Sequence, residues 1–155
     1  MIQDNLDEKN LEKIPAKVSS ISNRLRVLLA EDDDELRKLL TWSLHREGFT
    51  VTECADGMDL LNHLEGYLLF EEASGFDLIV SDIRMPGITG IEILEGLHAH
   101  ENCPPVILIT AFGDEETHAQ AHLLGAAAIF DKPFDIVDLL AKVRETLHPS
   151  LTSGK

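Results

Sequence analysis

Short apolar runs alternate with amphipathic segments along the chain from residue 26 onward. Four of five strand-length runs are apolar without alternation, which is typical of parallel strands buried on both faces. The second run, T-V-T-E-C, alternates between polar and apolar residues, so we expect it at an edge of the sheet. The runs are Val27–Ala30, Thr50–Cys54, Asp77–Ser81, Val106–Ile109 and Ala127–Phe130.

The segments between these runs carry apolar residues at helical spacing, and each such stripe is expected to pack against the sheet. Asp114 and Asp135 are expected to cap helix N-termini, and Gly48 and Gly125 follow predicted helix ends. The stripes are Leu36, Leu39, Leu40 and Leu44; Met58, Leu61, Leu64 and Leu68; Ile88, Ile91 and Leu94; and Ile136, Leu139, Leu140, Val143 and Leu147.

The helix expected near residues 114–124 is an exception, because its apolar surface is little more than Ala121 and Leu124. A helix with so few buried contacts is weakly anchored, and we expect it to be able to move.

Five strands that alternate with five helices predict an α/β fold. The expected form is a doubly wound, five-stranded parallel sheet of (βα)5 type in a three-layer sandwich. Ligands of such sheets bind at the carboxyl ends of the strands, at the topological switch point. The predicted domain covers residues 26–148, with a mobile arm or short docking helix at residues 1–25 and a flexible tail at residues 149–155.

Composition narrows the class of protein. The chain has 155 residues and a formal net charge of −15, so we expect one domain and no unaided binding to nucleic acid or to an anionic membrane. Cys54 and Cys103 show no metal-type spacing and are expected to pack as small apolar residues in a reducing compartment. The charged N-terminus is unlike a signal peptide, and no apolar run approaches the roughly 20 residues of a membrane span. These features predict a cytoplasmic protein.

Charged and hydroxyl side chains follow the predicted strands at the edge where ligands bind. Glu31 and Asp32 follow the first strand, Asp82 follows the third, Thr110 ends the fourth and Lys132 follows the fifth. Polar residues commonly gather where strands leave a core, but no other position on this rim is comparably charged. Close carboxylates repel one another, and oxygen ligands favour Mg²⁺ (or Mn²⁺) as the cation that relieves the repulsion. The set suits phosphoryl transfer to a carboxylate, with Asp82 as the nucleophile.

Four segments together resemble the response-regulator receiver family, and they occur in that family's order: R-V-L-L-A-E-D-D, V-S-D-I-R-M-P-G, I-T-A and D-K-P-F. The resemblance covers residues 25–148 and implies a flavodoxin-like fold and a phosphorylation switch rather than an enzyme. A histidine kinase or phosphotransfer protein would supply the phosphoryl group. The fourth helix, fifth strand and fifth helix of the domain would then change their affinity for an output partner or a second copy.

The resemblance also implies a role for each residue that matches a family motif. The implied roles are Asp82 as phospho-acceptor, Glu31 and Asp32 as the acidic metal ligands beside Asp82, Arg84 as donor of a backbone carbonyl to the metal, Thr110 as the hydroxyl that follows the phosphoryl group, and Lys132 as its counter-ion.

The chain departs from the family pattern at several places. Ile129 occupies a switch position that is often aromatic, so Phe112 or Phe134 is expected to contribute instead. Residues 57–75 form a stretch roughly two helical turns longer than usual, which either extends the second helix or forms a contact surface. Arg84 and Phe112 flank the expected path of an attacking water. Because neither is a carboxamide or a carboxylate, we expect slow loss of the phosphoryl group.

Two other functions have weaker support. The D-D-D run after the first strand is similar to the Asp-x-Asp motif of haloacid-dehalogenase-type phosphatases, but Leu36 stands where Thr or Val is expected, and no acidic pair follows Lys132. His118 and His122 have the i, i+4 spacing of zinc ligands, yet the metalloprotease glutamate is missing between them, and both are expected to be solvated. The sequence leaves open whether the chain is a free-standing receiver or a piece of a longer regulator.

Overall fold

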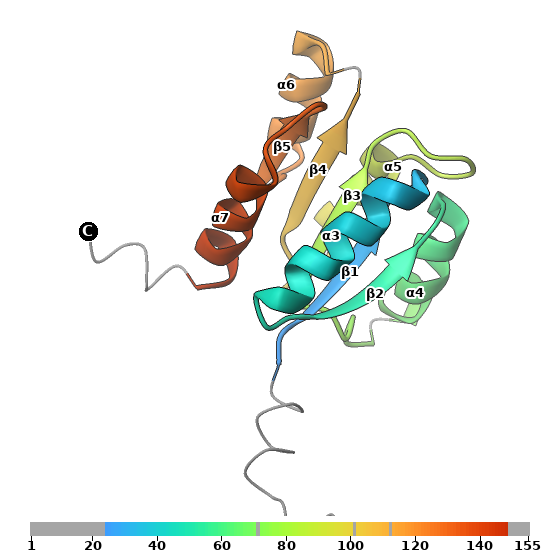
Figure 1. The fold of residues 1–155 in the computed structure, drawn as a ribbon. Helices are drawn as coiled ribbons and strands as arrows, with labels where there is room; N and C mark the ends of the chain where they lie inside the picture. Colours follow the sequence, from blue (N-terminus) through green and yellow to red (C-terminus); the bar gives the residue numbers. More distant parts are fainter. Residues whose placement is uncertain (1–23, 71, 101, 112, 149–155) are drawn as a thin grey trace, which may run out of the picture.

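A computed structural model describes residues 24–70, 72–100, 102–111 and 113–148 (Figure 1). The strands in these ranges are β1 Arg26–Ala30, β2 Thr50–Cys54, β3 Leu78–Asp82, β4 Val106–Thr110 and β5 Ala128–Asp131. The helices are α3 Asp34–Arg46, α4 Gly57–Phe70, α5 Gly90–His98, α6 Glu115–Leu123 and α7 Ile136–Leu147. Almost all of the predicted arm and the whole of the predicted tail lie outside the described residues.

The described strands form one parallel sheet in the order β2-β1-β3-β4-β5. The chain leaves β1 toward β2 on one side and returns to β3 on the other, so the topological switch point lies between β1 and β3. This is the predicted doubly wound, flavodoxin-like order. The alternating strand β2 lies at an edge, as its sequence indicates.

Helices cover both faces of the sheet, and the two layers of side chains between sheet and helices form the core (Figure 1). One face packs against α3 and α7, whose fully buried residues are Leu40, Leu44, Leu139 and Val143. The other face packs against α4, α5 and α6, which contribute Leu60, Leu64, Tyr67, Ile93, Leu94, Leu97 and Ala121. The three-layer sandwich is therefore confirmed.

Two of the predicted apolar stripes are wrong in part. Leu39 and Met58 are 46% and 51% exposed, although both were assigned to buried faces. In α4 the buried row is Leu60, Leu64 and Tyr67. This helix is apolar around most of its circumference, so the spacing of apolar residues alone does not determine which row faces the sheet.

Strand β5 is less buried than its apolar sequence indicates. Ala128, Ile129 and Phe130 are only half-buried, because β5 is the second edge strand and pairs with β4 alone. Helix α6, which lies beside β5, has one fully buried residue in the described part of the chain, Ala121. The prediction that this helix buries little apolar surface is confirmed.

Local signals fix most of the element boundaries. The carboxylates of Asp114 and Asp135 accept backbone N–H bonds at the starts of α6 and α7, as predicted. Gly48 and Gly125 follow the ends of α3 and α6 with φ values of +99° and +83°, a region that favours glycine. Residues 57–70 are one continuous helix, so most of the long stretch at residues 57–75 is helical.

Two further predictions concern exposure. Cys54 is buried as expected, but Cys103 is exposed, so the prediction that it packs as an apolar residue is wrong. Among the described residues, no helix combines the length and apolar character needed to span a membrane.

Candidate functional site

The predicted acidic residues meet at the carboxyl ends of two adjacent central strands. β1 and β3 pair with Ala30 opposite Ser81, so the residues that follow, Glu31 and Asp82, lie side by side at the switch point. Glu31, Asp32 and Asp82 each place a carboxylate oxygen within 4.8 Å of the other two. Glu31 is fully buried and Asp82 is 4% exposed, whereas Asp32 is exposed. The structure thus brings the three predicted carboxylates together.

Lys132 contacts the two buried carboxylates. Its Nζ atom lies 2.7 Å from Asp82 Oδ2 and 2.9 Å from Glu31 Oε1. The lysine follows β5, and its backbone N–H donates to the carbonyl oxygen of Thr110 at 2.7 Å, which holds it beside the end of β4. Its peptide bond to Pro133 is cis. The Lys132 ammonium, which follows β5, therefore contacts the carboxylate of Glu31 after β1 and that of Asp82 at the end of β3.

The charges at this site shift the pKa values of its members. Burial raises the pKa of Glu31 to about 7, although the nearby Lys132 opposes the shift. Burial alone would lower the pKa of Lys132, but its hydrogen bond to Asp82 and its attraction to the carboxylates of Asp82 and Glu31 outweigh burial and raise that pKa above its ordinary value. The ammonium is therefore charged at neutral pH, while Glu31 lies close to its midpoint.

The backbone after Asp82 holds this carboxylate in place. The N–H of Arg84 donates to Asp82 Oδ1 at 3.0 Å, and the N–H of Gly90 donates to the carbonyl of Ile83 at 2.9 Å. A Cβ atom at Gly90 would lie 2.7 Å from the carbonyl oxygen of Asp82, so only glycine allows this approach. The Arg84 side chain is exposed, at the solvent side of the site.

Thr110 and Ile129 lie on the same face of the sheet. Leu108 and Ile129 pack in one core cluster, and Thr110 follows Leu108 by two residues, so strand alternation places it on that face as well. Thr110 is fully buried at the end of β4. Phe112, which was expected to flank the path of water, lies outside the described residues.

Two residues that hold Glu31 were not predicted from the sequence. The N–H of Asp33 donates to Glu31 Oε2 at 3.0 Å, and Arg37 Nη1 donates to the Glu31 carbonyl at 2.7 Å. Arg37 also pairs with Asp34 and Glu53, and these contacts raise its pKa. The sequence offers one signal for the role of Arg37, which is its position in the first turn of a helix directly after the acidic run at residues 31–34. Such residues are common on solvated helix faces, so the signal was weak.

The residues present fit a divalent metal ion. Their donors are carboxylate oxygens, which Mg²⁺ and Mn²⁺ prefer. Glu31 Oε1 is buried, and although Lys132 lies close to it, no donor is aligned with this oxygen for a hydrogen bond. A buried anionic oxygen in this condition is suited to a cation. The site therefore has both the donor chemistry and an oxygen available to a metal.

Comparisons with known proteins point to one family of domains. The family model for the response regulator receiver domain matches residues 27–144. The transcriptional activator protein PfeR of Pseudomonas aeruginosa is 38% identical over 126 residues, which are 79% of this chain and 38% of that protein. The transcriptional regulatory protein FixJ of Azorhizobium caulinodans is 35% identical over 133 residues, or 84% of this chain and 59% of that protein. The chain thus spans less than two thirds of these curated relatives.

Solved structures of receivers share the fold. A CheY-like response regulator receiver domain protein from Methanospirillum hungatei superimposes with a TM-score of 0.72 at 27% identity, over 84% of this chain and 99% of that one. The receiver domain of the Francisella response regulator 1452 gives a TM-score of 0.69 at 26% identity, over 82% of this chain and 99% of that one.

Proposed function

Because the chain belongs to the response regulator receiver domain family, we propose that it is a phosphorylation switch whose acceptor is Asp82. The observation that carries the proposal is the contact of one ammonium, that of Lys132, with two buried carboxylates at the switch point of the sheet. The comparisons give no support to the haloacid-dehalogenase-type alternative. The buried position of Asp82, against the exposed Asp32, also favours Asp82 as the acceptor.

The proposed donor is a phosphohistidine of a histidine kinase or a phosphotransfer protein. A carboxylate oxygen of Asp82 forms a bond to phosphorus, and the phosphorus–nitrogen bond of the donor breaks. The electron pair of that bond stays with the imidazole, which takes up a proton, and an acyl phosphate remains on Asp82. The Arg84 N–H and the Lys132 ammonium hold the carboxylate in position for this attack.

The residues around Asp82 would compensate the charge that the phosphoryl group brings. Lys132 is close enough to transfer part of its attraction from the carboxylate to the phosphoryl oxygens, and Thr110 is the proposed hydroxyl that follows them. Glu31, Asp32, Asp82 and the Arg84 carbonyl would bind Mg²⁺ or Mn²⁺, which supplies positive charge to the phosphoryl oxygens.

The proposed output surface is formed by α6, β5 and α7. Helix α6 has little buried surface, and β5 is half-buried, so this part of the domain can rearrange at the lowest cost in lost contacts. Ile129 shares a face with Thr110, so a movement of the threonine toward a phosphoryl group opens space beside Ile129. A phosphorylation-dependent partner, or a second copy of the chain, would bind the rearranged surface.

Labelling with acetyl phosphate and Mg²⁺ tests the acceptor. Intact-mass spectrometry should show one phosphoryl group on the parent and on Asp138→Asn, a matched change of an exposed aspartate on α7. It should show none on Asp82→Asn. Labelling of Asp82→Asn at the parental rate would refute the assignment, and labelling of Asp32 with continuous turnover would favour the phosphatase.

A further inference from the structure

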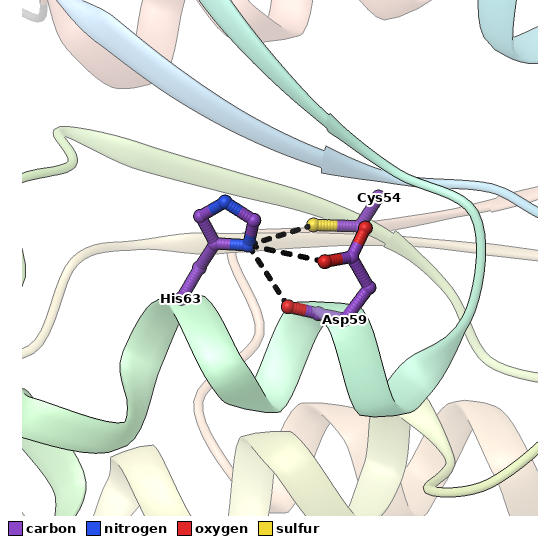
Figure 2. Close-up of side chains that lie close together, drawn as sticks. All are labelled: Cys54, Asp59 and His63. Carbon is purple, nitrogen blue, oxygen red and sulfur yellow. Dashed lines mark hydrogen bonds and ion pairs between the residues drawn. The ribbon is translucent and has the colours of Figure 1, made fainter.

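A second cluster of metal-ligating side chains lies between the edge strand β2 and helix α4, apart from the acidic site (Figure 2). Cys54 is the last residue of β2, and Asp59 and His63 are one helical turn apart on α4. Figure 2 shows the three side chains directed toward one another. His63 Nδ1 lies 3.6 Å from Cys54 Sγ and 3.6 Å from Asp59 Oδ1. None of the three side chains contributes to the acidic site.

The donor set differs in chemistry from that of the acidic site. A thiol, an imidazole and a carboxylate favour zinc and neighbouring transition metals, whereas the all-oxygen site favours Mg²⁺. We propose that Cys54, Asp59 and His63 form a binding site for Zn²⁺ or a similar divalent transition metal, with water in the fourth coordination position.

The distances suit a tetrahedral ion. Zinc bonds of about 2.3 Å to sulfur and about 2.05 Å to nitrogen, at a tetrahedral angle, place the two ligand atoms about 3.6 Å apart. The same calculation with a bond of about 2.1 Å to oxygen places nitrogen and oxygen about 3.4 Å apart. The observed separations are 3.6 Å and 3.6 Å, and all three ligand atoms lie within 4.8 Å of one another. Small side-chain rotations therefore suffice to bind the ion.

Binding would replace the existing contacts of His63 Nδ1 with Cys54 Sγ and Asp59 Oδ1 by bonds to the metal. His63 Nδ1 also lies 2.9 Å from the backbone carbonyl oxygen of Asp59. A metal needs the lone pair of this nitrogen, so the imidazole proton moves to Nε2 and any hydrogen bond from Nδ1 to that carbonyl is lost. The carbonyl lies in the first turns of α4, where the helical pattern already supplies it with the backbone N–H of residue 63.

Exposure gives the ion a route into the site. The side chains of His63 and Asp59 are 35% and 44% exposed, while Cys54 is fully buried beneath them. An ion arriving from solvent would pass between the imidazole and the carboxylate and reach the sulfur last. The full burial of Cys54 also argues against the other interpretation of the cluster, a reactive thiol for redox sensing, because such cysteines are accessible to solvent.

The proposed zinc site adjoins the acidic site, so a test must keep the added metal from binding at the acidic site instead. The backbone N–H of Glu31 donates to the carbonyl oxygen of Cys54 at 3.1 Å, so the two sites are one hydrogen bond apart. Excess Mg²⁺ should therefore fill the acidic site while the second metal is added. Co²⁺ is the spectroscopic probe, because a thiolate ligand gives it a charge-transfer band in the near ultraviolet.

The full chain should bind one equivalent of Co²⁺ with a thiolate charge-transfer band, and Zn²⁺ should displace it. Cys103→Ser, which removes the exposed cysteine, should leave the band unchanged, and Cys54→Ser should abolish it. His63→Gln, on the half-exposed side of the cluster, should weaken Zn²⁺ binding more than about 100-fold, since loss of an outer-shell partner alone costs about 10–100-fold.

Three results would contradict the proposed zinc site. A band that disappears in Cys103→Ser, or Zn²⁺ binding that His63→Gln leaves at parental strength, would overturn the proposal, as would the absence of a band in the parent. Circular dichroism identifies a variant that fails to fold. If Cys54→Ser is such a variant, His63→Gln and Asp59→Ala, which change partly exposed side chains, still decide the question.

Discussion

Glu31→Gln should stabilise the metal-free protein at neutral pH, because it removes a carboxyl group that the fold ionises at a cost in free energy. Glu31 is fully buried, and it shares the ammonium of Lys132 with Asp82. Burial raises its pKa from 4.5 to about 7. A shift of about two and a half units, at about 1.4 kcal/mol per unit, corresponds to roughly 3 kcal/mol.

The direction of the pH dependence follows from linkage. Below pH 4.5 the carboxyl group holds its proton in both the folded and the unfolded chain, and its contribution to stability is fully present. Between 4.5 and about 7 the folded chain keeps a proton that the unfolded chain has released. The free energy of unfolding of the parent therefore falls as the pH rises through this window, and the loss is complete just above the folded pKa.

Urea denaturation in EDTA across this pH range measures the effect. The glutamine variant imitates the protonated carboxyl group, so its stability advantage over the parent should grow from near zero to about 3 kcal/mol with rising pH. Titrating groups remote from the acidic site are common to both proteins and cancel in the difference. Glu35→Gln, the same change at an exposed position on α3, should show no such growth. Saturating Mg²⁺ should reduce the advantage, because the parent alone keeps all three acidic ligands.

A difference between parent and Glu31→Gln that does not change with pH would refute this reasoning. The same holds if the variant is the less stable protein at pH 7.5 in EDTA, because the attraction of Lys132 would then exceed the cost of burying the Glu31 charge.

Four further substitutions test other parts of the structure. Arg84→Asn should shorten the lifetime of the acyl phosphate, because a carboxamide can orient water where the arginine cannot; release of phosphate from the labelled protein measures it. Gly90→Ala forces a Cβ to within 2.7 Å of the Asp82 carbonyl oxygen and should cost about 1–3 kcal/mol of stability and slow labelling by acetyl phosphate. Leu64→Ala removes a fully buried side chain of α4 and should cost about 2–5 kcal/mol in urea denaturation. Asp135→Ala removes the N-cap of α7 and should cost about 1 kcal/mol in the same assay.

The architecture could be predicted because buried parallel strands leave a strong pattern in the sequence. Each of the five apolar runs became a strand, and the predicted and observed boundaries differ by no more than one residue. The predictions of burial were wrong where the pattern of apolar residues does not determine which side chains face the core. Helix α4 is apolar on several sides, so its buried row depends on how it lies against the sheet. The partial burial of β5 depends on its position at an edge, which its composition does not reveal.

The acidic site could be predicted because parallel strands bring their carboxyl ends to one edge of the sheet. This rule predicts that Glu31, Asp82 and Lys132 lie together, and in the structure the Lys132 ammonium contacts both carboxylates. No comparable rule joins Cys54 to His63. The strand and the helix that carry them are consecutive in sequence, but whether their side chains meet depends on the rotation of α4 about its axis.

The burial of the elements around the acidic site indicates where phosphorylation would be converted into movement. A phosphoryl group adds about −1.5 to −2 charges beside Lys132, whose backbone is joined to Thr110 by a 2.7 Å hydrogen bond. An element that moves in response loses packing contacts, so the elements with the fewest buried side chains move at the lowest cost in free energy. Helices α3, α4 and α5 each bury three or more side chains, whereas α6 buries only that of Ala121 among the described residues. We therefore expect the same electrostatic force to displace α6 and the half-buried β5 before the more deeply anchored helices, and a partner that senses the proposed phosphorylation to contact that surface.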